Sequence, residues 1–406
     1  MPQVHNIAPL SGVVVVDLSR ALAGPQATMM LADLGARVIK VESPDGDDSR
    51  HWGPPFVGDD GISTYFLSCN RNKESVTANL KSEEGRSFLT ALLQVADVLV
   101  ENFRPGVLER LGFGEQRLRE LNPRLVICSL TGFGHDGPEW QRAGYDQIAQ
   151  GEAGLMSLTG PAGEPTKVGV PIGDLLAGMN GAYGIVAALF ERERTGRGRV
   201  VRASLLSSIV GAHAFQGTRY TVAGQVPTGE GNHHPSIAPY GIFRTADAPI
   251  QIACGNDAIW RRLCQVLDLF VEDPRFASNQ LRVQHRDRVT ARLETVLRGA
   301  PADHWLKLLE HAGVPAGRVR TLDEVYTWDQ TRSQGLLVEV DHPTLGPVEL
   351  PGPALRFDDN PYAGAREHHT HPPLLGEHDD SVRAWLGLTS AALGTEDKPW
   401  ASTKSA

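Results

Sequence analysis

The segment from Val13 to Glu42 constrains the fold more than any other part of the chain. Four consecutive valines, Val13 to Val16, predict a buried strand, and the loop SRALAG follows it. Helical periodicity then runs through ATMMLADL, with Pro25 expected at the first helical position and Gly35 as the stop. The sequence RVIKVE predicts a second buried strand. Such a strand–helix–strand unit predicts two parallel strands joined by a right-handed crossover.

The same alternation continues along the chain. Ser82 is expected to cap a helix over residues 83–95, and the longest helix is expected over residues 174–194. Further strands are predicted at residues 98–100 and 125–130, with a short helix at 107–111 between them. The first 200 residues therefore predict an α/β fold with an open, doubly wound parallel sheet. In the longest helix, a stripe for close packing is expected at Gly178, Gly181 and Gly184.

A length of 406 residues allows two to three domains. We expect residues 1–200 to form the first part of a large domain, followed by a linker at 201–239 that is rich in Gly, Pro and His. A smaller domain is expected at 240–325, and residues 326–406 are expected to return to the large domain. The polar tail from about residue 394 is expected to be frayed.

Composition excludes several classes of protein. The formal net charge is −9, which argues against a sequence-independent grip on nucleic acid. The N-terminus has no signal-peptide pattern, and the longest weakly polar run, Met179 to Phe190, is too short to span a bilayer. The four cysteines have no CxxC spacing, so free thiols in a reducing cytoplasm are expected. We therefore expect a cytoplasmic protein without a membrane or nucleic-acid partner.

Three motifs point to functions that the surrounding sequence does not support. GFGHDG matches a dinucleotide-binding pattern, but Pro138 follows it and no helix opens there, so a plain turn is favoured. The histidines at 368, 369, 371 and 378 lie in a Pro-rich segment, and a solvated surface is favoured over a zinc site. Neither a GxSxG elbow nor a P-loop occurs, which argues against a serine hydrolase and an NTPase.

Asp174 in GVPIGDLLAG stands at the start of the longest predicted helix. By local physics alone, an ordinary N-cap aspartate is the favoured interpretation. A carboxylate nucleophile is the alternative, because a helix N-terminus favours the anion, lowers its pKa and offers free N–H groups to an oxyanion.

A second candidate is a group of basic residues near one predicted edge of the sheet. Arg71 and Lys73 lie in CNRNKES, and Arg104 and Arg110 lie in ENFRPGVLERLGFG together with Asn102. Each charge alone is expected to be solvated. Together, at the carboxyl ends of parallel strands, they would suit a polyanion such as a phosphorylated nucleotide.

Many segments, in order, resemble family III CoA-transferases (the CaiB/BaiF or formyl-CoA/carnitine-CoA transferase type). They span about residues 9–386, and the similarity is specific because so many motifs agree in order. These segments are DLSRALAGPQATMMLADLGARVIKVESP, NRNK, ENFRPGVLERLGFG, LNPRLVICSLTGFGHDGP, GYD, the Gly-Asp at 173–174, TGRGR, YGIFRTADAPIQIACGNDAIWRRLCQVL, AGVPAGRVRTLDEV and PPLLGEHDD.

The resemblance implies a Rossmann-like large domain, a smaller α/β domain and an interlocked homodimer. It also implies that Asp174 attacks an acyl-CoA donor and carries first an anhydride and then an aspartyl-CoA thioester. No metal, redox or permanently bound cofactor is needed, and coenzyme A is a substrate and product.

By the same resemblance, Leu22 and Ala23 line the pantetheine entrance, Ser43 lies near the adenine, and Arg142 and Tyr145 lie near the pantetheine or acyl end. The CoA nucleotide is expected to be held by Arg71, Asn72, Lys73, Asn102, Phe103, Arg104 and Arg110. The chain departs from the family pattern at Ser43, Glu74 and Arg202, which puts details of CoA contact in question.

Two other functions remain open from the sequence. An α-methylacyl-CoA racemase is disfavoured, since Tyr145 stands where those enzymes carry a histidine base. A non-catalytic acyl-CoA-binding dimer would require Asp174 to be only a cap. For a transferase, HHPSIAPYG and GND resemble members acting on small dicarboxylates such as succinate, mesaconate, itaconate or malate, and His233, His234 or Arg244 are candidates for a distal carboxylate. The segment lacks the glycine run of oxalate/formyl-CoA enzymes, so oxalate is not expected.

Overall fold

The computed structural model describes residues 8–269, 273–357 and 363–388. The chain divides into two compact units: unit 1 comprises residues 1–153, 170–213 and 329–406, and unit 2 comprises 154–169 and 214–328. The domain boundaries expected from the sequence stay a prediction, and the tail expected from about residue 394 lies outside the described residues. The expected linker at 201–239 holds most of β8 (Val200–Ser204), α8 (Leu205–Gly211) and α9 (Ala214–Thr221).

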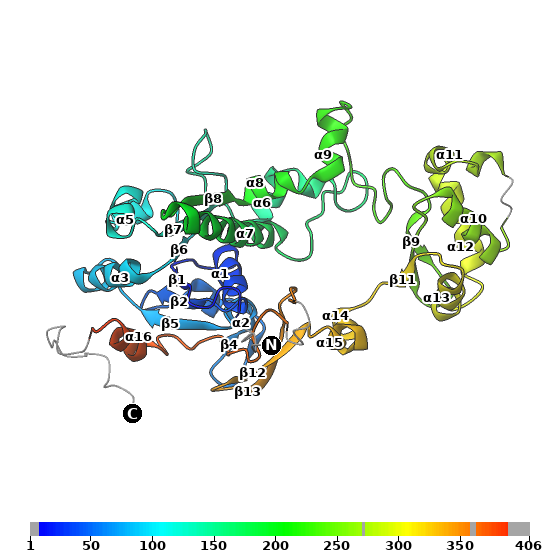
Figure 1. Cartoon of the computed structure of the whole chain (residues 1–406). Coiled ribbons are helices and arrows are strands. Elements are labelled where there is room, and N and C mark those ends of the chain that lie inside the picture. The colour runs from blue at the N-terminus through cyan, green and yellow to red at the C-terminus, as the bar shows by residue number, and fades with distance from the viewer. Residues whose placement is uncertain (1–7, 270–272, 358–362, 389–406) are drawn as a thin grey trace, which may run out of the picture. The chain divides into compact units, whose positions relative to one another are not determined.

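Unit 1 is built on a six-stranded parallel sheet in the order β5-β2-β1-β6-β7-β8 (Figure 1). The strand order therefore reverses between β1 and β6. In such sheets a ligand binds outside the carboxyl ends of the strands, at the point of reversal. The strands before β8 are β1 (Val14–Asp17), β2 (Arg37–Glu42), β5 (Lys73–Thr77), β6 (Val98–Glu101) and β7 (Val126–Thr131).

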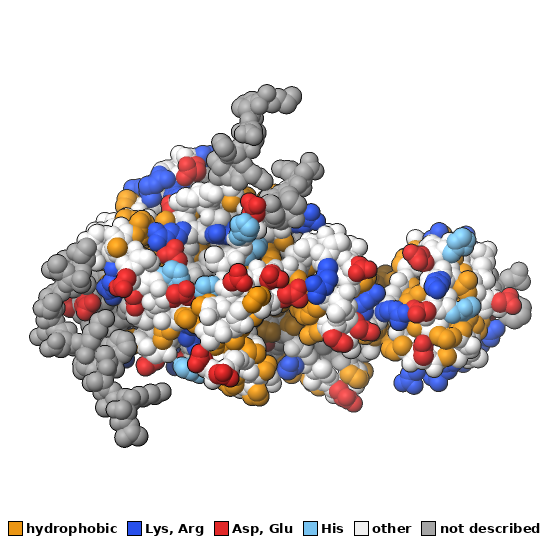
Figure 2. All heavy atoms as spheres, turned by 90° about the horizontal axis from the view of Figure 1, so that it is seen from below, with side chains coloured by type: hydrophobic (Ala, Val, Ile, Leu, Met, Phe, Trp, Pro, Cys, Tyr) orange, Lys and Arg blue, Asp and Glu red, His pale blue; other side chains and the backbone are white. Residues whose placement is uncertain are grey.

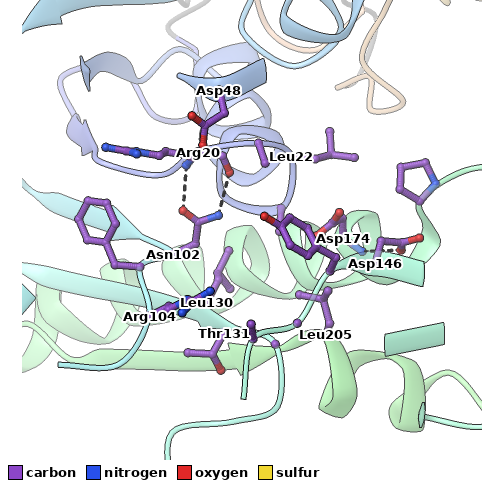
Figure 3. Close-up of a pocket in the computed structure, with 18 of the residues that line it drawn as sticks. Arg20, Leu22, Asp48, Asn102, Arg104, Leu130, Thr131, Asp146, Asp174 and Leu205 are labelled. Atoms are coloured by element: carbon purple, nitrogen blue, oxygen red, sulfur yellow. Dashed lines mark hydrogen bonds between the residues drawn. The ribbon is translucent and has the colours of Figure 1, made fainter. Parts of the chain in front are cut away.

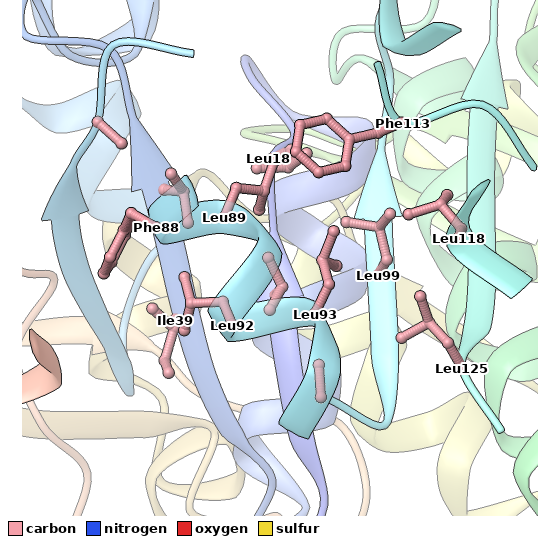
Figure 4. Packing of buried hydrophobic residues seen from close by; sticks show 14 of the residues in the cluster. Leu18, Ile39, Phe88, Leu89, Leu92, Leu93, Leu99, Phe113, Leu118 and Leu125 are labelled. Carbon is pink, nitrogen blue, oxygen red and sulfur yellow. The ribbon is translucent and has the colours of Figure 1, made fainter. Parts of the chain in front are cut away.

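Helices cover both faces of this sheet (Figure 1). On one face, Phe88, Leu92 and Leu93 of α3 lie in one buried cluster with Ile39 and Leu99 of the sheet (Figure 4). Burial of apolar side chains in such a cluster is the main force that holds a helix on a sheet. The helices on this side are α3 (Glu83–Val95), α4 (Val107–Arg110) and α5 (Glu115–Leu121).

The other face carries α1 (Ala23–Asp33) and α7 (Ile172–Thr195). The glycine stripe of α7 is packed closely, as predicted: a Cβ at Gly178 would lie 2.6 Å from the carbonyl oxygen of Ala23, and one at Gly184 would lie 2.5 Å from Val201. Among the described helices, α7 is the one long and apolar enough to cross a membrane. One face of it packs on α1, α8, β7 and β8, and the other face is exposed.

The local predictions are confirmed at some helix starts and wrong at others. Ser82 caps α3, accepting a hydrogen bond from the backbone N–H of Gly85 at 3.1 Å. Helix α1 already begins at Ala23, so Pro25 is its third residue and the prediction of a first position is wrong. The expected free thiols are confirmed, because all four cysteines are free and buried.

Shorter elements complete unit 1. The hairpin of β12 and β13 packs Val338, Val340 and Leu350 against Leu67 of α2. Thus a segment late in the chain closes over one near its start. These elements are η1 (Asp48–His51), β3 (Phe56–Val57), β4 (Ile62–Ser63), α2 (Thr64–Ser68), α6 (Asp146–Glu152), α15 (Asp329–Ser333), β12 (Leu337–His342), β13 (Gly346–Pro351) and α16 (Asp379–Trp385).

Unit 2 has a core of its own around a three-stranded antiparallel sheet in the order β11-β10-β9. Phe243, Ile250 and Ile252 of the sheet lie in one buried cluster with Trp260 and Trp305 of two helices. Besides α9, the elements are η2 (Leu155–Ser157), β9 (Tyr240–Arg244), β10 (Pro249–Ala253), α10 (Asp257–Val266), η3 (Pro274–Phe276), α11 (Asn279–Gln284), α12 (Arg286–Leu297), α13 (Ala302–His311), β11 (Ala316–Arg318) and α14 (Leu322–Thr327).

The surface carries mixed charge. On the face seen in Figure 2, Lys and Arg side chains are interspersed with Asp and Glu side chains. This mixture agrees with the negative net charge of −9 and gives no broad basic area on that face.

Candidate active site

A cavity of about 400 Å³ lies in unit 1 at the carboxyl ends of β1, β6 and β7, where the strand order reverses. Its walls are the turn after β1, the loops after β6 and β7, and the start of α7 (Figure 3). The position agrees with the rule for ligand sites in sheets of this topology. Asp174 lies in its lining.

Asp174 is the third residue of α7, and Pro171 occupies the N-cap position. The N-cap interpretation is therefore wrong. The cap is supplied instead by Asp146, the first residue of α6, whose Oδ1 accepts hydrogen bonds from the backbone N–H groups of Gly173 at 2.7 Å and Asp174 at 3.3 Å (Figure 3). These two N–H groups are thus occupied, which corrects the expectation that they are free for an oxyanion.

The electrostatic setting of Asp174 also differs from the expectation. Burial and then the nearby carboxylate of Asp146 raise its pKa from 3.8 to about 7. The expected lowering by the helix N-terminus is wrong, because desolvation disfavours the anion and Asp146 already occupies the first N–H groups. A carboxyl group with a pKa near neutrality in a cavity is typical of functional sites.

The cavity brings together most of the site residues expected from the sequence. Besides Asp174, they come from the turn after β1, from the loop after β6 and from the segment between β7 and α6. They are Leu22, Ala23, Asn102, Phe103, Arg104, Arg142 and Tyr145.

Five of the expected CoA-binding residues do not line this cavity: Ser43, Arg71, Asn72, Lys73 and Arg110. Lys73 is buried, and its ammonium donates to Asp17 at 3.1 Å. Arg71 pairs with Asp33 at 2.5 Å, and Asn72 donates to the same carboxylate. The roles of these residues in CoA binding stay predictions, and in this structure the polar groups of Arg71, Asn72 and Lys73 have protein partners.

Ser43 and Arg110 lie outside the cavity for different reasons. The hydroxyl of Ser43 donates to the carbonyl oxygen of Gly46 at 3.1 Å within a turn. Arg110 is exposed at the end of the short helix α4.

Several lining residues were not singled out from the sequence. Tyr65 and Trp52 pack edge to face, with ring centroids 5.0 Å apart, and burial and then the charge of Asp174 raise the pKa of Tyr65. Asp146 stands in the GYD motif, so an acidic residue opening a helix was the available signal. For Tyr65 and Trp52 the local sequence holds no such signal.

Three arginines line the cavity: Arg20, Arg104 and Arg142. Arg142 forms ion pairs with Glu139 and Glu152 and lies over the ring of Phe133. Within the described part of the chain, the guanidinium groups of Arg20 and Arg104 have no carboxylate partner. Unpaired arginines at a cavity are well suited to bind phosphate or carboxylate groups.

The candidate histidines have ordinary structural contacts. In unit 2, the ring of His234 stacks on that of Phe215, and its centroid lies 5.1 Å from the ring centroid of Tyr240. The ring of His233 lies edge-on to that of Phe243. The backbone N–H of Arg244 donates to Glu294. In unit 1, His371 pairs with Glu377 at 3.0 Å. Over the described residues, no group of three or more His, Cys, Asp or Glu side chains is placed to hold a metal ion.

Comparisons with known proteins agree with this architecture. The family model described as "CoA-transferase family III" matches residues 10–379, so the chain belongs to this family of enzymes. A human protein named succinyl-CoA:glutarate CoA-transferase is 41% identical over 382 residues, covering 93% of this chain and 86% of the relative. A protein from Haloarcula marismortui named succinyl-CoA:mesaconate CoA-transferase is 37% identical, covering 92% of this chain and 95% of the relative.

The fold is shared with a solved structure as well. The crystal structure of a CAIB/BAIF family protein from Brucella suis superposes with a TM-score of 0.83 at 41% identity, covering 93% of this chain and 99% of that one. The predicted family and enzyme class are therefore confirmed.

Proposed function

We propose that this enzyme transfers CoA from succinyl-CoA to a small dicarboxylic acid such as glutarate or mesaconate, with Asp174 as the covalent carrier. The observation that carries the proposal is a carboxylate in the cavity at the switch point of the sheet, on a helix start that a second carboxylate caps. The names of the similar enzymes support the substrate class.

The proposed chemistry needs no group beyond this side chain and the substrates. The Asp174 carboxylate attacks the donor thioester, forms a C–O bond and expels CoA thiolate, leaving a mixed anhydride. The thiolate attacks the aspartyl carbonyl, releasing the donor acid and forming an aspartyl-CoA thioester. The acceptor carboxylate attacks this thioester and expels CoA thiolate, which leaves a second mixed anhydride. The thiolate then attacks the acceptor carbonyl of that anhydride, forming the product thioester and releasing the Asp174 carboxylate.

A raised pKa fits this role. An anion that burial and Asp146 destabilise is a stronger base and nucleophile than an exposed carboxylate. The free energy of this anion falls most when its charge is neutralised by formation of the anhydride bond. We propose that Arg20 and Arg104, which have no carboxylate partner among the described residues, hold the phosphates of CoA in a Rossmann-like large domain.

The covalent carrier is tested by trapping. Enzyme incubated with succinyl-CoA is treated with hydroxylamine or borohydride, digested and analysed by mass spectrometry. An adduct on the peptide that contains Asp174, absent without succinyl-CoA, is the expected result. Turnover accompanied by an adduct on a different peptide would contradict the role of Asp174.

The substrate class is tested with a panel of acceptor acids: glutarate, mesaconate, itaconate, malate, succinate and oxalate.

We also propose a homodimer. Helix α7 exposes Met179, Tyr183, Val186 and Phe190, at 50, 77, 39 and 68%, and their spacing places them on one face. Three of them border an apolar cavity of about 640 Å³. A second copy of the chain would remove this surface from water. Light scattering should give twice the chain mass, and Tyr183→Glu should shift the measured mass toward that of the monomer.

The expected cytoplasmic location stays a prediction, testable by cell fractionation.

A further inference from the structure

The turn from Ser19 to Leu22 lies between β1 and α1, and its residues Arg20, Ala21 and Leu22 line the cavity. Ala21 within it has φ 63°, in the left-handed region that residues with a side chain rarely adopt. Such a conformation persists only when the surrounding structure over-determines it. The backbone of this turn is indeed held by side chains from two other segments.

The first of these supports is a buried ion pair between Lys40 of β2 and Asp47. Both side chains are 1% exposed, and the ammonium lies 2.8 Å from the carboxylate. Lys40 also donates to the carbonyl oxygen of Ser19 at 2.8 Å, and Asp47 accepts from the backbone N–H of Ala21 at 3.1 Å. The pair therefore joins the two ends of the Ser19–Ala21 segment.

The second support comes from Asn102, which follows β6. The side-chain amide of Asn102 accepts from the backbone N–H of Arg20 and donates to its carbonyl oxygen, both at 2.8 Å (Figure 3). Three consecutive residues of the turn are thus held by side chains. Asn102 holds the backbone of Arg20, and the Lys40–Asp47 pair holds the backbone of Ser19 and Ala21 on either side of it in the sequence.

A buried ion pair is not in itself a source of stability, because desolvation of the two charges offsets their attraction. The specific contribution of this pair is geometric, since each partner ends on a backbone group of the turn. We infer that Lys40 and Asp47 are positioning residues that hold the Ser19–Leu22 turn in the conformation that admits CoA to the cavity. This inference rests on the proposed role of the cavity as the CoA site.

Kinetics of Lys40→Met, Lys40→Arg and Asp47→Asn in the full-length enzyme test this inference. The KM for succinyl-CoA and the Kd for CoA are measured with kcat and the KM for the dicarboxylate. In Lys40→Met we expect both CoA constants to rise about tenfold, with kcat and the dicarboxylate KM changed by less than about threefold. Lys40→Arg should recover part of the CoA affinity, because it restores a charged donor.

The matched control is Arg192→Met, which breaks the part-buried pair of Arg192 and Asp97 at the amino end of β6, 3.0 Å apart. It should lower the melting temperature without changing the CoA constants. If Lys40→Met does not fold, Asp47→Asn tests the inference in its place, and we expect its CoA constants to rise about threefold. Folded Lys40 and Asp47 variants with CoA constants like those of the control would overturn the inference. Absence of CoA exchange in the unmodified enzyme would instead refute the proposed function.

Discussion

The carboxyl end of β1 carries the buried carboxylate of Asp17, and the amino end of α7 carries the half-buried carboxylate of Asp174. Their surroundings shift the two pKa values in opposite directions. Burial alone would raise the pKa of Asp17, but Lys73, Lys40 and the hydroxyls of Ser19 and Thr28 outweigh it and lower the pKa to about 2. Among the described residues, no Lys or Arg side chain offsets the charge of Asp174, and burial and then Asp146 raise its pKa to about 7.

This difference separates a carboxylate that holds the fold from one that is available for chemistry. A fully compensated anion is stable and unreactive, because its lone pairs are already used by donors. An undercompensated anion in a cavity stores free energy that a bond to substrate can release. The distinction predicts different outcomes when each group is changed.

The largest expected effect is on catalysis at Asp174. Asp174→Ala removes the proposed nucleophile, so CoA exchange should fall by about 10³-fold or more. Because the side chain is not part of the proposed CoA phosphate site, calorimetry should show CoA affinity within about threefold of the unmodified enzyme. Exchange at the normal rate would leave the cavity as a binding site only.

The next effect is on stability at the other carboxylate. Lys73→Met leaves Asp17 buried with one fewer cation, and the free energy of unfolding in urea should fall by about 3–5 kcal/mol. Arg37→Met is the control, because it breaks a more exposed pair with Glu74 on the neighbouring strands and should cost only about 0–1 kcal/mol. Similar losses in both variants would mean that the buried Lys73–Asp17 pair contributes no more to the free energy of unfolding than the more exposed Arg37–Glu74 pair.

The raised pKa of Asp174 predicts the acid limb of the pH–rate profile. The nucleophile must be ionised, so kcat/KM for succinyl-CoA should fall about tenfold per pH unit below a midpoint near pH 7. Asp146→Asn removes the neighbouring charge and should move this midpoint to lower pH. A midpoint near the ordinary value of 3.8 in the unmodified enzyme would contradict the assignment.

The smallest expected effect is a gain in stability. A carboxyl group whose folded pKa is raised binds its proton more firmly in the folded state, so the free energy of unfolding falls as pH rises from 3.8 to about 7. Asp174→Asn removes this cost. Urea unfolding at pH 8 should show the variant more stable by about 1 kcal/mol, with a smaller gain at pH 5.5. A variant that is less stable at pH 8 would mean that interactions in the folded protein stabilise the Asp174 carboxylate.

The sequence by itself determined the strand–helix–strand pattern of the sheet and the Ser82 cap, because these depend on local periodicity and on residues a few positions apart. It also made Asp174 a candidate nucleophile, through the resemblance carried by motifs in order along the chain, and that role stays a prediction. Only the tertiary structure decided what surrounds each charge. Lys73 and Arg71, whose role at a phosphate site stays a prediction, pair with Asp17 and Asp33 from segments distant in the chain.

The same reason explains the cap of α7 and the pKa of Asp174. Local rules predicted that the helix N-terminus lowers the pKa of Asp174. Burial raises this pKa instead, and so does the carboxylate of Asp146, which lies 28 residues earlier and caps the helix. Solvent exclusion and charge proximity are properties of the packed chain, and neither can be obtained from residue types in order.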